Sequence, residues 1–299
     1  MIVAAIIVSY NTTNLLRRCI RSVRDSARLS PIIVVDNASC DGSANMVREE
    51  FPDVILIANS TNLGFAAACN QAIHSTKAPF YFLLNPDTIV DGLDISRLID
   101  IMRAQPNVAV CAPKIVNADG SLQHSCRRFP RLPLLAMDEL GLAKLFPQSQ
   151  WFGEYRMTWW THNDLREVDQ PMGAALLLRS KAIDAVGTFD ERFFMYFEEV
   201  DLCFRLAKRG WKIIFVPDTS VTHIGGSSAK QDITAMTLAR YRSMFNFYRK
   251  HYPPSHLFVL KCAVTLAIVG RVVAYSLPPF FYSGKRAAFF AVLRQLRSL

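Results

Sequence analysis

The chain of 299 residues is long enough for one large domain, or for one domain with a substantial C-terminal tail. Hydrophobic residues make up 51% of it and charged residues 20%, which excludes an intrinsically disordered chain, because this composition can bury enough apolar surface to offset the entropy of ordering. The formal net charge of +9 is concentrated at the C-terminus, where residues 230–299 hold 11 Lys and Arg against one Asp. This asymmetry favours an anionic surface as a partner.

The cysteines and the N-terminus bear on the compartment. Seven Cys form an odd set without a CxxC pair, which fits neither a disulfide framework nor a zinc ribbon and predicts reduced thiols used as small apolar residues. The N-terminal sequence MIVAAIIVSYN lacks the basic region and cleavage site of a signal peptide. It therefore predicts a buried first strand.

The first hundred residues alternate between short apolar runs and helical patterns. The runs predict strands at Ile2–Val8, Pro31–Val35, Val54–Ile57 and Phe80–Leu84, and the patterns between them predict helices near Asn14–Ser26, Ser43–Glu50 and Phe65–Ser75. Strand and helix in alternation predict an α/β fold with an open, mostly parallel sheet flanked by helices.

The pattern changes at residues 120–170, which are rich in Pro, aromatic and basic residues and show helical character only near Leu134–Leu145. A segment of this length inside a compact domain is more often functional than not, so we interpret it as an insertion. Strands at Ala174–Leu178 and Lys212–Val216 and helices at Val200–Lys208 and Ile233–Lys250 follow.

The tail contains an apolar stretch from Leu257 to Leu277 that Lys261 and Arg271 interrupt. Its uninterrupted part, Cys262–Gly270, is shorter than the roughly 20 residues that a membrane-spanning helix needs. We therefore favour an interfacial or re-entrant helix with basic anchors. A spanning helix and an ordinary docked helix stay open as alternatives.

Polar residues follow three of the predicted strands, which end in Ser9-Tyr10-Asn11, in Asp36-Asn37 and in Asn85-Pro86-Asp87. Open α/β sheets bind ligands outside the carboxyl ends of their strands, so these residues predict a ligand site on one rim. Taken singly, each is equally well explained as a turn or a helix cap.

No GxGxxG or GxxxxGK[ST] motif is present, so a phosphate group would have to be neutralised in another way. Asp87 offers a hard carboxylate oxygen for Mg²⁺ or Mn²⁺ bridging a diphosphate. His223, in the sequence HIGGSS, is a candidate for a metal or phosphate role, and its alternative is a structural histidine.

Three carboxylates, Glu198, Glu199 and Asp201, follow a strongly apolar segment. Acids at a helix N-terminus interact favourably with the helix dipole, which explains one or two of them. A carboxylate partly shielded from water is also suited to act as a general base toward an acceptor hydroxyl.

The order of these motifs resembles a known family. VSYN, VVDNASCDGS, NLGFAAACN, LLNPDT, MGAALLLR, FDERFFMYFEEVDLCFRL, GW and HIGGSS follow one another over about Ile2–Tyr252. Together they resemble a family 2 glycosyltransferase of the GT-A fold, and are most similar to the bacterial rhamnosyltransferases of cell-surface polysaccharide assembly.

The resemblance implies roles for the rim residues. Tyr10, Asp36 and Asn37 match positions that hold the nucleoside, with Ser9 and Asn11 beside them, and Asn62, Gly64 and Asn70 match the lining of the donor pocket. Asn85-Pro86-Asp87 takes the place of the family's DxD. Because its first Asp is Asn here, metal binding falls on Asp87, with His223 as a further ligand. Glu199 matches the catalytic base, and Glu198 and Asp201 are its neighbours.

The implied reaction is inverting and depends on Mg²⁺ or Mn²⁺. One sugar, L-rhamnose from dTDP-rhamnose, moves to a lipid-linked saccharide on the cytoplasmic face of the cell membrane, with the enzyme peripheral on the membrane surface. Residues 1–229 would form the catalytic domain and residues 230–299 a membrane-associating helical region. In the insertion, Arg127, Arg128, Arg131, Trp159 and Trp160 would face the acceptor; the alternative is a surface loop with buried Trp.

Other functions stay open. The same fold could use a UDP-hexose or galactofuranose donor, or the protein could be a catalytically silent sugar-nucleotide-binding module. A processive synthase is disfavoured because QxxRW is absent and multiple spanning helices are not predicted. Nucleic acid is not expected as a partner, since no recognition motif accompanies the basic tail.

Overall fold

The computed structural model describes residues 3–27, 29–225, 232–276, 283–296 and 299, so residues 226–228 of the HIGGSS motif and 277–282 of the tail lie outside the described residues. Its contacts divide the chain into two units. Unit 1 comprises Met1–Cys126, His162–Glu191 and Glu198–Ser228, and unit 2 comprises Arg127–Thr161, Arg192–Phe197 and Ala229–Leu299. Most of the predicted insertion therefore groups with the C-terminal region.

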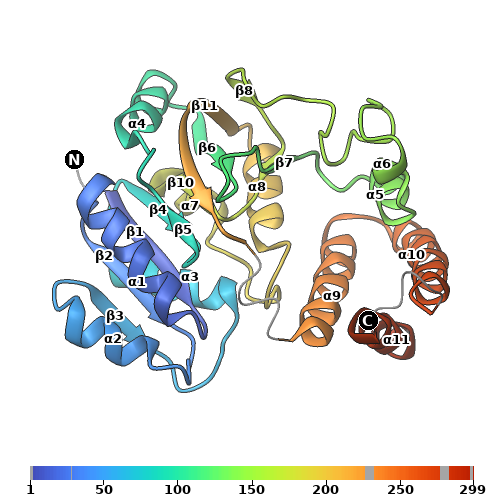
Figure 1. Cartoon of the computed structure of the whole chain (residues 1–299). Coiled ribbons are helices and arrows are strands. Elements are labelled where there is room, and N and C mark those ends of the chain that lie inside the picture. Colours follow the sequence, from blue (N-terminus) through green and yellow to red (C-terminus); the bar gives the residue numbers. More distant parts are fainter. Residues whose placement is uncertain (1–2, 28, 226–231, 277–282, 297–298) are drawn as a thin grey trace. The chain divides into compact units, whose positions relative to one another are not determined.

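Unit 1 begins with four strands that lie parallel in the order β3-β2-β1-β4 (Figure 1). They are β1 (Val3–Ser9), β2 (Ile32–Asp36), β3 (Ile55–Ala58) and β4 (Phe80–Leu84). Every residue of β1, β2 and β4 is buried, as expected for strands with helices on both faces of the sheet. The predicted N-terminal strands are confirmed.

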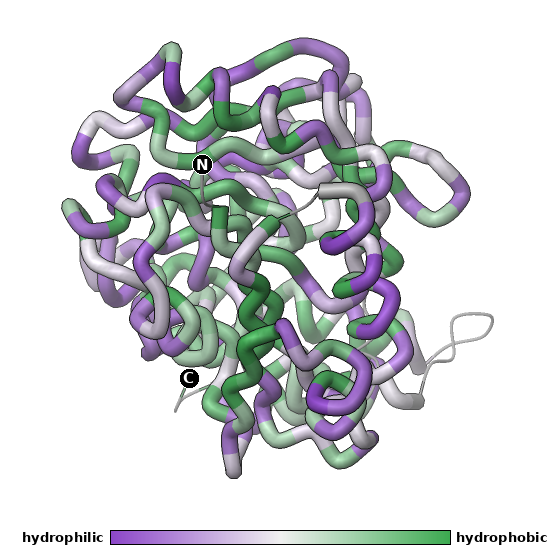
Figure 2. Tube along the Cα trace, turned by 90° about the vertical axis from the view of Figure 1, so that its left-hand side faces the viewer, coloured by the Kyte–Doolittle hydropathy of each residue, from purple (hydrophilic) through white to green (hydrophobic). Residues whose placement is uncertain are grey.

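Helices connect these strands: α1 (Thr13–Ser22), which continues as the short π-helical segment η1 (Val23–Ala27), α2 (Ser43–Glu50) and α3 (Phe65–Ser75). The helix α1 buries Leu16, Cys19 and Ile20 and turns its arginines outward. Hydrophilic and hydrophobic residues alternate along the helical turns (Figure 2). Five of the seven Cys, all free thiols, are buried, in agreement with their use as apolar residues.

The rest of the sheet is mixed. Its order continues β4-β10-β6-β11-β5, with β10 (Ala175–Arg179) antiparallel to both β4 and β6 (Val108–Val116). The long strand β11 (Lys212–His223) runs parallel to β6 and antiparallel to β5 (Thr88–Ile89) and β8 (Arg166–Glu167). The prediction of an open α/β sheet flanked by helices is confirmed. The strand β10 was predicted as well, but its antiparallel orientation was not.

The remaining elements of unit 1 are α4 (Ile95–Ala104), β9 (Gln170–Pro171), α7 (Ser180–Val186) and α8 (Glu198–Lys208). The short strand β7 (Cys126–Arg127) contains the last residue of the first segment of unit 1 and the first residue of unit 2. Neither α4 nor β6 was predicted. The helix α8 begins two residues earlier than expected, so Glu198 and Glu199 lie in its first turn.

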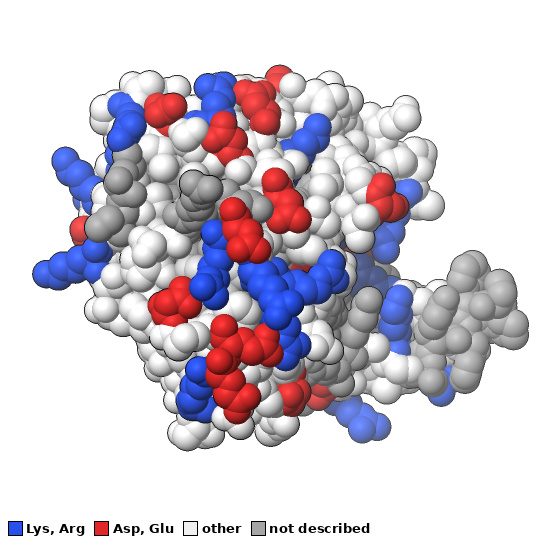
Figure 3. Space-filling view, turned by 60° about the vertical axis from the view of Figure 1, so that its left-hand side comes forward, with Lys and Arg blue, Asp and Glu red and all other residues white. Residues whose placement is uncertain are grey.

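Acidic and basic side chains alternate on the face shown in Figure 3.

Unit 2 is helical, with α5 (Leu132–Glu139), α6 (Leu142–Leu145), α9 (Ile233–His251), α10 (Pro254–Ala274) and α11 (Ser283–Gln295). At its centre, Glu139 is only 1% exposed. Its carboxylate accepts hydrogen bonds from Arg240 and Tyr241 of α9 and from Arg271 of α10. Burial raises the pKa of Glu139, but the charges of Arg240 and Arg271 outweigh burial and hold that pKa below its usual range.

We predict that Glu139→Gln destabilises the protein by about 3–5 kcal/mol, because it leaves two guanidinium groups without their buried counter-charge. The measurement is urea unfolding followed by circular dichroism. Asp218→Asn, which breaks the exposed Arg97–Asp218 pair, is the control and should cost less than about 1 kcal/mol. Equal losses from the two substitutions would contradict the central role of Glu139.

Candidate active site

The parallel strands β1 and β2 bring their carboxyl ends together, because Ser9 and Asp36 are register partners. Both are buried. Asp36 Oδ2 accepts a hydrogen bond from the Ser39 N–H at 2.9 Å, whereas Oδ1 has no partner among the described residues. A buried acceptor without a protein donor is costly, so this oxygen suits a ligand N–H group.

The loops next to this carboxylate are fixed by side-chain hydrogen bonds. Asn11 adopts a left-handed backbone conformation (φ 52°), which Asn tolerates, and its Oδ1 accepts from the Cys40 N–H at 2.8 Å. Ser9 Oγ bonds Thr12 Oγ1 at 2.9 Å. Tyr10, between them, is 37% exposed. The rim therefore presents an accessible aromatic ring on a braced loop.

Two of the predicted pocket residues brace the backbone. Asn37 donates to the Gly64 carbonyl at 3.0 Å and accepts from Asn59 Nδ2 at 2.9 Å. Asn70 uses both amide hydrogens on Phe189 O and Glu191 Oε1, and its Oδ1 accepts from the Phe189 N–H. Asn70 thereby ties α3 to the segment before α8, which leaves its amide no donor for a ligand.

Residues 59–64 form the loop that leads into α3. Asn62 Oδ1 accepts from the Gly64 N–H at 3.0 Å, and Gly64 has a φ of 86° at the N-cap of the helix. A side chain at Gly64 would be strained at this angle. The loop is therefore held close to Asn37 by backbone geometry.

His223 and Asp87 meet because β11 pairs with β5, in a register that places His223 opposite Thr88. His223 Nε2 lies 3.3 Å from Asp87 Oδ1 and 3.4 Å from Asn85 Nδ2, and both Asp87 and His223 are buried. Burial raises the pKa of Asp87, but the hydrogen bond and charge of His223 outweigh it, so that pKa lies below its usual range. The carboxyl is therefore ionised at neutral pH.

Gln123 orients the imidazole. His223 Nδ1 donates to Gln123 Oε1 at 2.7 Å, while Gln123 Nε2 donates to Asn117 Oδ1 at 2.8 Å and so fixes the orientation of the amide. Since Oε1 can only accept, Nδ1 carries the hydrogen. Nε2 is left to hold either a proton shared with Asp87 or a cation.

An imidazole nitrogen beside a carboxylate oxygen, with the other ring N–H held by an amide, is the donor arrangement of protein metal sites, so these residues fit a divalent ion. The described residues contain no group of three or more His, Cys, Asp or Glu that could hold one. Further ligands would therefore come from outside this pair, as when a diphosphate supplies oxygens.

The three carboxylates of α8 have different surroundings. Glu198 is buried, and burial together with the charge of Glu199 raises its pKa well above the usual range. Glu199 is half-buried and packs on Gly173, where an added Cβ would lie 3.8 Å from the Glu199 side chain. The next residue, Ala174, accepts the Asn85 N–H at 3.0 Å. Contacts therefore connect Glu199 with the Asn85–Asp87 turn.

Asp201 has a structural environment. It is fully buried, and its Oδ2 accepts from Arg205 Nε at 2.7 Å, one helical turn further on. Arg205 also donates to the carbonyls of Val186, Gly187 and Thr188. Through Arg205, Asp201 therefore fastens α8 to the preceding loop, and its place among the catalytic carboxylates stays a prediction.

The expected acceptor residues lie in unit 2. Arg128 Nε and Trp159 Nε1 both donate to Glu154, at 2.7 and 3.1 Å. Arg127 is half-buried, and Arg131 is the exposed N-cap of α5. Trp160 is only 4% exposed, as the alternative of a buried Trp describes, so a role for its ring toward an acceptor stays a prediction.

Gln123, Gly173 and Arg205 were not singled out from the sequence. Arg205 lies four residues after Asp201, and this helical spacing would have indicated an ion pair. Gln123 and Gly173 carry no comparable signal, because their partners are 100 and 26 residues away.

Solved structures share this architecture. One is the crystal structure of GalNAc-T7 with UDP, GalNAc and Mn²⁺ (TM-score 0.56, 16% identity, 74% of this chain and 43% of that one). A second is the mannosyltransferase PcManGT from Pyrobaculum calidifontis with GDP-Man and Mn²⁺ (TM-score 0.55, 16% identity, 99% and 86%). At these identities the likeness defines the class of fold, which is GT-A.

Sequence comparisons define the family. Residues 4–163 match the model of glycosyl transferase family 2. The N-acetylglucosaminyl-diphospho-decaprenol L-rhamnosyltransferase of Mycobacterium tuberculosis is 31% identical over 72% of this chain and 73% of its own length. The low-salt glycan biosynthesis hexosyltransferase Agl10 of Haloferax volcanii is 24% identical over 62% and 56%. The chain belongs to glycosyl transferase family 2, and the predicted family is confirmed.

The buried acid predicts a pH effect. Above about pH 4.3 the unfolded chain ionises Glu198 while the folded chain keeps the proton, so this group lowers the free energy of unfolding as pH rises. We predict that Glu198→Gln is more stable than the parent near neutral pH, by a margin that shrinks toward pH 4. Urea unfolding across this range measures it.

Glu49→Gln, an exposed change on α2, is the control and should follow the parent at every pH. A constant difference between Glu198→Gln and the parent would contradict the raised pKa.

Proposed function

We propose that this chain is an inverting rhamnosyltransferase that transfers L-rhamnose from dTDP-rhamnose to a lipid-linked saccharide in cell-surface polysaccharide synthesis. The observation that carries the transferase mechanism is the packing of Glu199 on Gly173, beside the residue that holds the Asn85–Asp87 turn. The choice of rhamnose is supported by the similarity to the mycobacterial rhamnosyltransferase, which spans 72% of the chain.

In this proposal Glu199 is the general base. It would accept the proton of the acceptor hydroxyl as that oxygen attacks the anomeric carbon, with inversion. Glu198, kept protonated by burial and by the neighbouring charge, leaves Glu199 as the ionised member of the pair. A single base suffices, since the nucleoside diphosphate departs without a protein acid.

The donor would lie along the rim. Asp36 Oδ1 offers an acceptor for a base N–H, and Tyr10 an aromatic face for the nucleoside. Ser9, Asn11, Asn37, Asn62, Gly64 and Asn70 would keep the loops of this pocket in place.

Asp87 and His223 would hold Mg²⁺ or Mn²⁺, with Asn85 beside them. The ion, when bound, would neutralise charge on the diphosphate leaving group. Asp87 contributes an ionised carboxylate and Gln123 keeps His223 Nε2 directed at it. Both Mn²⁺-containing structural neighbours are solved with nucleotides or nucleotide sugars, which supports this role for the ion.

The acceptor and the location complete the proposal. Arg127, Arg128 and Trp159 would contact the acceptor saccharide or its phosphates, and residues 230–299 would associate with the cytoplasmic face of the cell membrane. The relative's name specifies a diphospho-decaprenol acceptor, which supports a lipid-linked substrate.

The test is release of nucleoside diphosphate by purified protein with Mn²⁺ and a lipid-linked acceptor extract, across dTDP- and UDP-sugars. We expect acceptor-dependent release from dTDP-rhamnose. Glu199→Gln should lower turnover by about 10²-fold or more while dTDP binding stays unchanged, because only the proton acceptor is lost.

Release from a UDP-hexose or UDP-galactofuranose instead would overturn the rhamnosyl assignment. Undiminished turnover in Glu199→Gln would overturn the assignment of the base. Donor binding without turnover across the panel would favour a silent binding module.

The proposed metal site predicts a positioning role for Gln123. In the presence of dTDP, Gln123→Leu should raise the Mn²⁺ dissociation constant about 10-fold, since His223 loses the acceptor that fixes its ring. Electron paramagnetic resonance of unbound Mn²⁺ measures this constant without turnover. Gln123→Glu, which keeps an acceptor, should restore it.

Ser121→Ala is the matched control, because it loosens the same turn at Asn117 and leaves the Gln123–His223 bond intact. An unchanged constant in Gln123→Leu would rule out this positioning role.

A further inference from the structure

One face of α10 is apolar and exposed within the described part of unit 2. Phe258 is 70% exposed, Leu266 66% and Val273 55%. Val259, Cys262 and Val269 are exposed as well. At 3.6 residues per turn, these six side chains lie within an arc of about 100°. We call them the α10 outer face.

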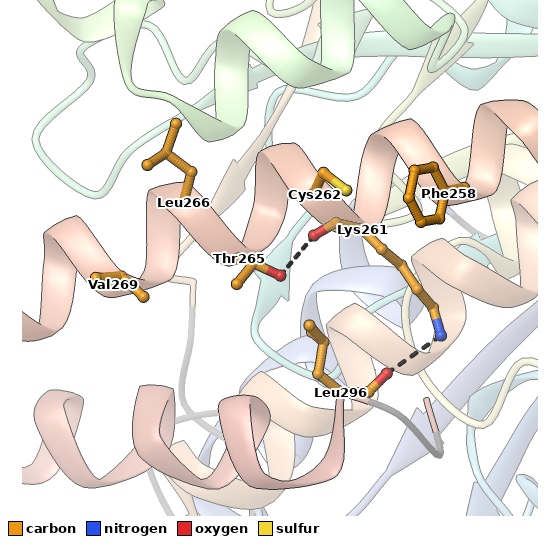
Figure 4. Close-up of a pocket in the computed structure, with 7 residues that line it drawn as sticks. All are labelled: Phe258, Lys261, Cys262, Thr265, Leu266, Val269 and Leu296. Carbon is orange, nitrogen blue, oxygen red and sulfur yellow. Dashed lines mark hydrogen bonds between the residues drawn. The ribbon is translucent and has the colours of Figure 1, made fainter.

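The opposite face of α10 packs into unit 2 through Leu260, Val264, Ala267, Ile268 and Val272. The two charges of the helix lie off the outer face. Arg271 donates to Glu139 Oε2 at 3.0 Å and to the Tyr241 hydroxyl at 2.7 Å. Lys261 reaches toward α11, where its Nζ donates to Leu296 O at 3.1 Å (Figure 4). The outer face is therefore continuously apolar.

We propose that the α10 outer face docks onto the surface of an anionic lipid bilayer, with α10 lying in the plane of the membrane. An apolar helical face next to basic residues is the pattern of interfacial helices. No Asp or Glu follows Asp232 in the sequence, and Arg249, Lys285 and Arg294 of the neighbouring helices are exposed. This excess of positive charge complements acidic headgroups.

The face is also hollowed. Phe258, Cys262, Leu266 and Val269 line a groove of about 670 Å³, together with Lys261 and Thr265 of α10 and with Leu296, the residue after α11 (Figure 4). Such a groove accommodates part of an acyl chain, so hydrocarbon can replace water at the four outer-face residues that line it.

Contacts within unit 2 favour docking over spanning. With 21 residues α10 is about 31 Å long and apolar enough to cross a membrane by length and composition. Spanning would, however, expose Arg271 and Lys261 to hydrocarbon and remove Arg271 from Glu139, which is 1% exposed. A spanning arrangement is therefore unfavourable, because it places charges within hydrocarbon and removes a partner from a buried carboxylate.

This inference deepens the proposed membrane association and rests on it, but its test measures lipid contact and not sugar transfer. Cys262 is a native reporter, since Cys40 is the only other exposed thiol among the described residues. A fluorophore is placed on Cys262 in a Cys40→Ser background. For the other two positions, the protein carries both Cys40→Ser and Cys262→Ser, and the fluorophore is placed on the new thiol of Phe258→Cys or Val273→Cys.

Quenchers at known depths in phosphatidylglycerol–phosphatidylcholine vesicles then locate each position. In-plane docking predicts the same shallow depth at all three, about 5–10 Å into the headgroup boundary. A depth that changes steadily over the roughly 22 Å from position 258 to 273 would mean spanning, and absence of quenching would mean no lipid contact. Either result overturns the proposal.

A matched pair of variants tests the face itself. Leu266→Asp should weaken vesicle binding about 10-fold or more, because a charge replaces an exposed leucine that docking would bury in the bilayer. Leu145→Asp on α6, a 70% exposed position off the outer face, should leave it unchanged. Equal binding by the two variants would refute docking through this face, and dTDP binding in the same samples reports separately on the proposed function.

Discussion

The antiparallel pairing of β11 with β5 is the contact on which the candidate active site depends. It places His223 opposite Thr88 and so brings the imidazole to Asp87, more than 130 residues away in the chain. The pairing is short, but β11 is held along most of its length by β6, which makes its end a rigid support. Two side chains carried at a sheet edge keep their mutual geometry better than two carried on separate loops.

The acidic turn of α8 illustrates how environment separates chemically similar groups. Asp201 is neutralised by Arg205, Glu198 is buried against a like charge, and Glu199 is half-buried on Gly173. Two adjacent carboxyls that interact strongly cannot both ionise easily, so burial of one favours ionisation of the other. The sequence order EExD does not distinguish these three environments, because they arise from what packs around each side chain.

Local patterns predicted the N-terminal strands and helices well, since buried parallel strands such as β1 and β4 read as continuous apolar runs. They also brought Asp36, Asp87, Glu199 and His223 forward as candidates. They did not predict β10 as an antiparallel strand or Gln123 as the partner of His223, because both follow from contacts between distant segments. Likewise Arg271 interrupts the apolar stretch in the sequence, yet its charge is satisfied inside unit 2.

The two residues that precede α8 in the chain have a strained backbone. Tyr196 and Phe197 both have positive φ angles, 67° and 68°, which cost of order 1–3 kcal/mol each and persist only when neighbours hold them. Within unit 2, Ser243 of α9 donates to the Met195 carbonyl and Phe247 packs on Phe197. The next residue along the chain is Glu198. The helix α9 therefore holds, within unit 2, the two strained residues that precede α8 in the chain.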